Sequence, residues 1–156
     1  AGGNETRSTD AASTNVGGMR HIGDVVIQYQ VSKAIKVGLN VVYGEEKVNT
    51  ATPAATWGGA AGYLSITPVD GFTLSYRADY FDDRKGARSL NQVAGATGAQ
   101  VLGHTLTGTI SMYGGHFLIR PELKYDMDMS KRGMFTNGNE MKDASWTGLI
   151  AFTGVY

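Results

Sequence analysis

A period of two runs through most of this sequence and constrains its fold more than any other feature. From Met19 onward, apolar side chains occupy every second position in segments such as 35–43 and 72–80, with polar or small residues between them. Such alternation is typical of β-strands with two different faces and differs from the 3.6-residue repeat of amphipathic helices. Seven such segments are present, most of about 10 to 12 residues. They exceed the usual strand length and match strands that cross a bilayer at a tilt.

The links between these segments are alternately short and long. Three are tight turns made of standard turn residues: 32–34, 68–71 and 114–116. Three are long and rich in Gly, Asn, Thr and charge: 45–55, 82–100 and 128–143. This rhythm is typical of bacterial outer-membrane barrels, which have short periplasmic turns and long external loops. We therefore predict an all-β, antiparallel up-and-down transmembrane β-barrel over residues 19–156, preceded by a polar loop or disordered tail over 1–18.

The two faces of the predicted strands suggest two environments. The aliphatic side is expected to face lipid, with aromatic residues near segment ends at the membrane interfaces: Tyr29, Tyr43, Trp57, Tyr76, Tyr80, Tyr125, Trp146 and Tyr156. The other side is polar or small and is predicted to line a pore through seven residues: Lys36, Arg77, Asp79, Arg120, Glu122, Lys124 and Asp126.

Water or close pairing is required around these charges, because an unpaired ion in a dry core costs several kcal/mol. They could form a constriction that filters solutes by charge, or be ordinary wall residues in mutual ion pairs. Pro121 has no N–H and predicts a bulge or a broken hydrogen bond in its strand.

Composition excludes several other classes of function. Lysine and arginine (14) balance aspartate and glutamate (14), so nucleic acid is not an expected partner. There is no cysteine, and the three histidines match no ligand spacing. The acidic stretches 82–86 and 126–130 lack the spacing of a calcium loop. No nucleophile, base and orienting group come together, so we expect no catalytic site, metal or cofactor, and the protein is not predicted to be an enzyme.

Several short motifs resemble one family of barrels. Residues 74–88 (LSYRADYFDDRKGAR) resemble the "RAEYFxDxxG" segment of the OmpL-like β-barrel porins, and 119–126 (IRPELKYD) resemble their "RPEYRYD" strand. The pattern of 39–46 (LNVVYGEE) and the strand from Trp57 to Tyr63 are also similar. The resemblance covers about residues 20–156 and corresponds to the C-terminal part of that family, whose members are more than twice as long.

The resemblance implies that this chain is part of a larger barrel, or that other chains complete it. Seven strands are an odd count where single-chain bacterial barrels have an even one. The end of the sequence, with Tyr156, Phe152 and Ile150 on one face, resembles the terminal strand by which barrel-assembly machinery recognises its clients. Expected partners are therefore this machinery, outer-membrane lipid or lipopolysaccharide, and either further copies of the chain or missing N-terminal strands.

These observations together predict a porin-like channel for passive diffusion of small hydrophilic solutes across the bacterial outer membrane. Two alternatives stay open. One is a soluble all-β binding or structural module, such as a sandwich in which the aliphatic face packs against a second sheet. The other is a barrel that acts as a scaffold or sheath around other outer-membrane proteins.

Overall fold

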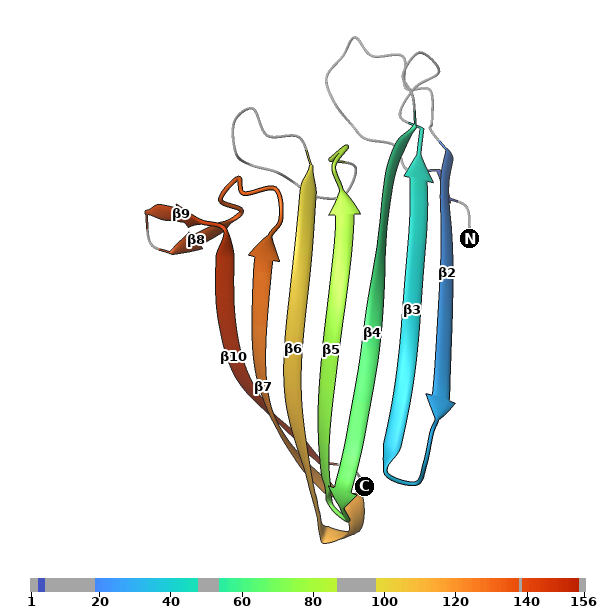
Figure 1. The fold of residues 1–156 in the computed structure, drawn as a ribbon, viewed down its shortest axis with the longest axis vertical. Coiled ribbons are helices and arrows are strands. Elements are labelled where there is room, and N and C mark those ends of the chain that lie inside the picture. The colour runs from blue at the N-terminus through green and yellow to red at the C-terminus, as the bar shows by residue number, and fades with distance from the viewer. Residues whose placement is uncertain (1–2, 5–18, 48–53, 87–97, 138, 155–156) are drawn as a thin grey trace.

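The computed structural model describes residues 3–4, 19–47, 54–86, 98–137 and 139–154, and most of this backbone is β-strand (Figure 1). One antiparallel sheet contains seven long strands, hydrogen-bonded in chain order: β2 (Met19–Gln30), β3 (Ile35–Glu46), β4 (Ala55–Val69), β5 (Phe72–Asp83), β6 (Ala99–Met112), β7 (Phe117–Asp128) and β10 (Ala144–Gly154). The prediction of an all-β fold with seven antiparallel strands is confirmed. Among the residues described, β10 does not pair with β2, so the sheet is an open arc of a barrel.

Four further short elements accompany the long strands. β1 (Gly3–Asn4) pairs with the beginning of β2, and β8 (Phe135–Asn137) pairs with β9 (Glu140–Lys142) in a small separate hairpin. One 3-10 turn, η1 (Tyr113–Gly115), joins β6 to β7. No helix in the described part of the chain is long and apolar enough to cross a membrane. Tyr156 and most of the predicted tail over 1–18 lie outside the described residues.

The connections follow the predicted alternation, with one difference. The three tight turns lie at one end of the sheet, and the strand ends joined by the long links lie at the other (Figure 1). The link 128–143, predicted as a loop, contains the β8–β9 hairpin. Its base is held by carboxylates: Asp128 accepts hydrogen bonds of 2.8 Å from the N–H groups of Ser130 and Arg132, and Asp143 accepts one of 2.9 Å from Gly133. Composition indicated only that this link is polar.

The register of the sheet separates two chemically different faces. Arg77 of β5 pairs with Thr105 of β6, which in turn pairs with Lys124 of β7, so the three side chains stand on one side. We call this side the polar face. The residues adjacent in sequence, such as Tyr76 and Leu123, stand on the other side, which we call the aliphatic face. The alternation read from the sequence therefore corresponds to real faces of a continuous sheet.

Neither face is covered by other parts of the described chain. Only three apolar side chains are buried there, Trp57, Ala61 and Ala99, whereas 28 large apolar or aromatic residues are exposed. On the aliphatic face Ile27 is 57% and Ile150 is 62% exposed. The sandwich alternative requires a second sheet over this face, and β8–β9 is the only other sheet among the described residues. The aliphatic face therefore needs an apolar environment from outside the described chain.

Pro121 interrupts pairing without shifting the register. The β6–β7 ladder has no pair opposite Pro121 and resumes at Ile110 and Ile119 in unchanged register. The broken hydrogen bond is therefore observed and the bulge is not, because the missing N–H removes a bond but leaves the strand extended. Gly108 stands opposite, and a Cβ there would lie 3.5 Å from Pro121 Cγ. A register shift occurs instead between positions 66 and 69 of β4, beside a tight turn.

The two faces predict opposite responses to a new charge on β3. If lipid covers the aliphatic face, Leu39→Arg should lower the free energy of unfolding by about 2–4 kcal/mol, the cost of arginine near the bilayer centre. Asn40→Arg introduces the same group on the polar face beside Asp24, where it should change stability little. Equilibrium urea unfolding of protein refolded into phospholipid vesicles measures both. Equal losses for the two variants would contradict this assignment of the faces.

Candidate functional site: the polar face of the sheet

The polar face carries all the residues predicted to line a pore. They come from three strands: Lys36 on β3, Arg77 and Asp79 on β5, and Arg120, Glu122, Lys124 and Asp126 on β7. Each lies at an even separation from its neighbours on the same strand, so the period of two holds the set on one side. Cross-strand pairing brings Arg77 level with Lys124, and Asp79 level with Asp126, on either side of β6.

Two ion pairs occupy the middle of this face. Arg77 Nε donates to Asp79 Oδ1 at 2.8 Å, and Lys124 Nζ lies 2.8 Å from Asp126 Oδ2. Each pair joins two positions of one strand, and all four side chains are partly exposed. Thr105 of β6 stands between the two cations. The centre of the polar face is therefore close to neutral while remaining strongly polar.

The other three charged residues lie closer to the tight turns. Glu122 accepts a hydrogen bond of 2.8 Å from Thr107 Oγ1. Lys36 and Arg120 are exposed, and neither has an ion pair with any carboxylate of the described residues. The Glu122 carboxylate offsets one of these two positive charges, so the three residues leave a net positive charge at this end of the polar face, which acts on any ion near it.

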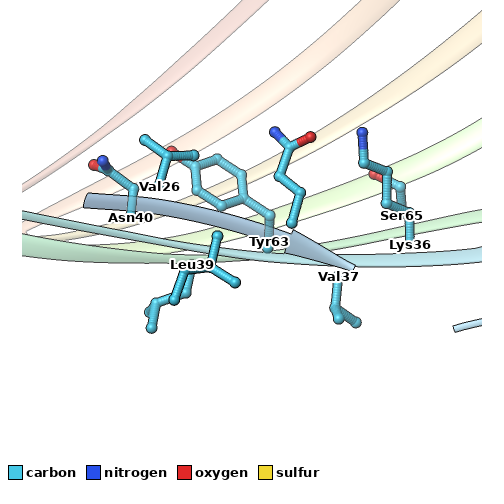
Figure 2. A pocket seen from close by; sticks show the side chains of 10 residues that line it. Val26, Lys36, Val37, Leu39, Asn40, Tyr63 and Ser65 are labelled. Atoms are coloured by element: carbon cyan, nitrogen blue, oxygen red, sulfur yellow. The ribbon is translucent and has the colours of Figure 1, made fainter. Parts of the chain in front are cut away.

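A hollow of about 400 Å³ opens on the polar face where β2, β3 and β4 meet. Figure 2 shows Lys36, Asn40 and Tyr63 on one side of the sheet and Leu39 on the other, with the remaining strands rising on the side of Lys36. Gly38 pairs with Tyr63, and a Cβ on Gly38 would make an ordinary van der Waals contact of 3.5 Å with Tyr63 Cδ2. The polar face is therefore the concave one, and it includes uncharged polar residues that the charge pattern did not indicate.

Trp57 lies on the polar face, so its predicted place on the aliphatic face is wrong. It pairs with Gly44, and its indole covers that glycine: a Cβ on Gly44 would lie 2.3 Å from Trp57 Cζ2. The side chain is only 6% exposed. Small residues occupy both faces of β4, so alternation along this strand gave no indication of which face is polar. The pairing of β4 with β3 places Trp57 on the polar face.

The aromatic residues of the aliphatic face form local contacts of their own. By register, six of the predicted set stand there: Tyr29, Tyr43, Tyr76, Tyr80, Tyr125 and Trp146. The Tyr76 hydroxyl and His104 Nδ1 are hydrogen-bonded at 2.6 Å, and the rings of Tyr125 and Trp146 have centroids 4.5 Å apart. His104 is thereby held by a neighbouring tyrosine on the outer surface of the sheet.

The carboxylate oxygens of the two acidic turns are bonded to groups of the same chain. Asp82 Oδ1 accepts the N–H of Arg84 at 3.1 Å, and its other oxygen lies 2.9 Å from the guanidinium of the same residue. Asp128 uses both oxygens on backbone N–H groups, as described above. In the described ranges, no group of three His, Cys, Asp or Glu side chains has the geometry to hold a metal ion.

Comparison with known proteins agrees with this architecture. The family model described as "Putative beta-barrel porin-2, OmpL-like" matches residues 1–154. No curated protein and no solved structure shows a significant match. Because the match spans nearly the whole sequence, the chain belongs to this family of β-barrel porins.

The Trp57–Gly44 contact makes a prediction about stability. Gly44→Ala places a methyl group inside the indole, and the overpacking should cost about 1–3 kcal/mol in the free energy of unfolding. Gly23→Ala on β2, where a Cβ meets nothing within 4 Å, is the matched control and should cost little. In the double variant with Trp57→Phe, the alanine at position 44 should be better tolerated. Unfolding followed by circular dichroism measures all three, and equal stability of the two alanine variants would refute the contact.

Proposed function

We propose that the polar face forms the wall of a water-filled pore in the bacterial outer membrane, through which small hydrophilic solutes diffuse passively. The observation that carries the proposal is the separation of the two faces: charged residues gather on the concave side, while exposed aliphatic residues cover the convex side. Long strands with one apolar face suit a lipid-exposed barrel wall. Membership of the porin family supports the same function.

The direction of the edge strands limits how such a pore closes. Seven antiparallel strands leave β2 and β10 running the same way (Figure 1). β1 pairs with only two residues of β2, so most of that edge is open, as is the outer edge of β10. Open edges are not tolerated in lipid, so further strands must pair with both. To be antiparallel to β2 and β10 alike, the added strands must be odd in number, which makes the total even. A second copy in the same orientation places its β2 parallel to β10, so we propose that strands of another kind, from the same polypeptide or a different one, complete the barrel.

The uncompensated cations suggest how the pore treats ions. The central pairs neutralise one another, whereas Lys36 and Arg120 near the tight turns do not. A net positive charge at one end of an aqueous passage favours anions. The proposed pore is therefore weakly anion-selective.

Planar-bilayer recording tests both conduction and its selectivity. The chain together with the strands that complete the barrel should form channels, and Lys36→Glu together with Arg120→Glu should shift the reversal potential toward that of cations. The matched control is Lys33→Glu, the same change of charge in the neighbouring tight turn, which should shift it much less. An unchanged reversal potential in the double variant would remove these residues from the lining. Absence of conductance, with other proteins co-purifying, would favour the scaffold or sheath.

Orientation in the membrane gives a second test. We propose that the tight turns face the periplasm and the long links face outward. The sequence contains no cysteine, so single cysteines report without background. Lys85→Cys beside a long link should react with an impermeant maleimide on intact cells, whereas Asp70→Cys in a tight turn should react only after lysis. The reverse pattern would invert this topology.

A further inference from the structure

The charges at the centre of the polar face are sorted by height along the strands. Asp79 and Asp126 stand at one level, on either side of Gly103 of β6. Two residues further toward the tight turns, Arg77 and Lys124 stand on either side of Thr105. The result is an acidic row and a basic row, side by side, with small residues of β6 between their members.

In each carboxylate of the acidic row, one oxygen is used in an ion pair and the other lies beside the space above Gly103. Asp79 Oδ1 is paired with Arg77, and Asp126 Oδ2 is paired with Lys124. The other oxygens, Asp79 Oδ2 and Asp126 Oδ1, each lie 3.0 Å from the point where a Cβ on Gly103 would stand. Since both are that close to one point, the two oxygens are at most about 6 Å apart, so an ammonium group placed between them is attracted to both carboxylates at once.

The basic row contains a hydroxyl group without a partner. Thr105 is 7% exposed, and its Oγ1 is buried and makes no hydrogen bond. A buried unsatisfied hydroxyl costs free energy, so a ligand oxygen that reaches it gains a bond at no loss of another. Arg77 and Lys124 flank this group and are 40% and 34% exposed, so both remain accessible from the concave side. The Arg77 guanidinium also has N–H groups beyond the Nε used for Asp79.

A solute that carries both charges satisfies both rows. Its ammonium group binds between Asp79 Oδ2 and Asp126 Oδ1. Its carboxylate accepts hydrogen bonds from Arg77 and Lys124, and from Thr105 once these side chains move aside. Singly charged solutes match one row and meet like charge in the other. The site already contains ion pairs, so a bound zwitterion replaces some of them with similar pairs to its own charges. The net gain is small, and binding is therefore weak and rapidly reversible, as permeation requires.

We propose that Asp79, Asp126, Arg77, Lys124, Gly103 and Thr105 form a recognition site for small zwitterions of the amino-acid type. The inference rests on the proposed function, because it takes the polar face to line an aqueous passage. The acidic row lies nearer the long links, so a solute entering from that side presents its ammonium group first.

Saturation-transfer NMR on the detergent-solubilised full chain tests the site without requiring conduction. The probes are L-alanine, propionate and ethylamine, and L-alanine should bind more tightly than either singly charged analogue. Gly103→Ala fills the space between the carboxylates and should weaken L-alanine binding about tenfold, the effect of losing one hydrogen bond to a charged group. Gly108→Ala is the matched control on the aliphatic face of the same strand, where a Cβ makes ordinary contacts.

A second variant keeps the test decisive if Gly103→Ala does not fold. Thr105→Val removes the unpartnered hydroxyl with little change of shape, so it should leave stability unchanged or raise it while weakening L-alanine binding. Ethylamine binding as tightly as L-alanine, or L-alanine binding unaffected by either variant, would overturn the zwitterion site. Binding of L-alanine without its permeation into vesicles would leave the site standing and overturn the proposed pore.

Discussion

Cross-strand register is the constraint on which the other features of this protein depend. Side chains alternate with a period of two, so a slip of one residue between neighbouring strands would carry a charged row to the aliphatic face. Apart from the register shift between positions 66 and 69 of β4, beside a tight turn, the ladders from β2 to β10 hold one consistent register, and Pro121 breaks pairing without changing it. The separation of polar and aliphatic surfaces is therefore a property of the whole sheet, and no single strand possesses it alone.

Small residues on the polar face determine how its large side chains lie. Gly44 allows the Trp57 indole to cover β3, and Gly103 leaves a space between two carboxylates. A larger residue at either position would push its neighbours toward the concave side. Glycine in strands is often read as a weakness of the ladder, but here its missing side chain shapes the surface.

The charges of the polar face are arranged so that most are compensated without being hidden. Arg77–Asp79 and Lys124–Asp126 are pairs within one strand, and both remain open to the concave side. Partial exposure avoids the desolvation that makes buried ion pairs costly. A wall built this way stays hydrated and nearly neutral at its centre, while Lys36 and Arg120 leave a positive bias near the tight turns.

Much of this architecture follows from the sequence by itself: the strands, their two faces, the alternation of short and long links, and which charges share a face, including the pairs two positions apart. These are local properties, set by the geometry of an extended backbone. The face occupied by Trp57, the β8–β9 hairpin and the meeting of Asp79 with Asp126 across Gly103 were decided only by the tertiary structure. Each depends on which residues of separate segments stand opposite one another, and that is settled by hydrogen bonding between strands.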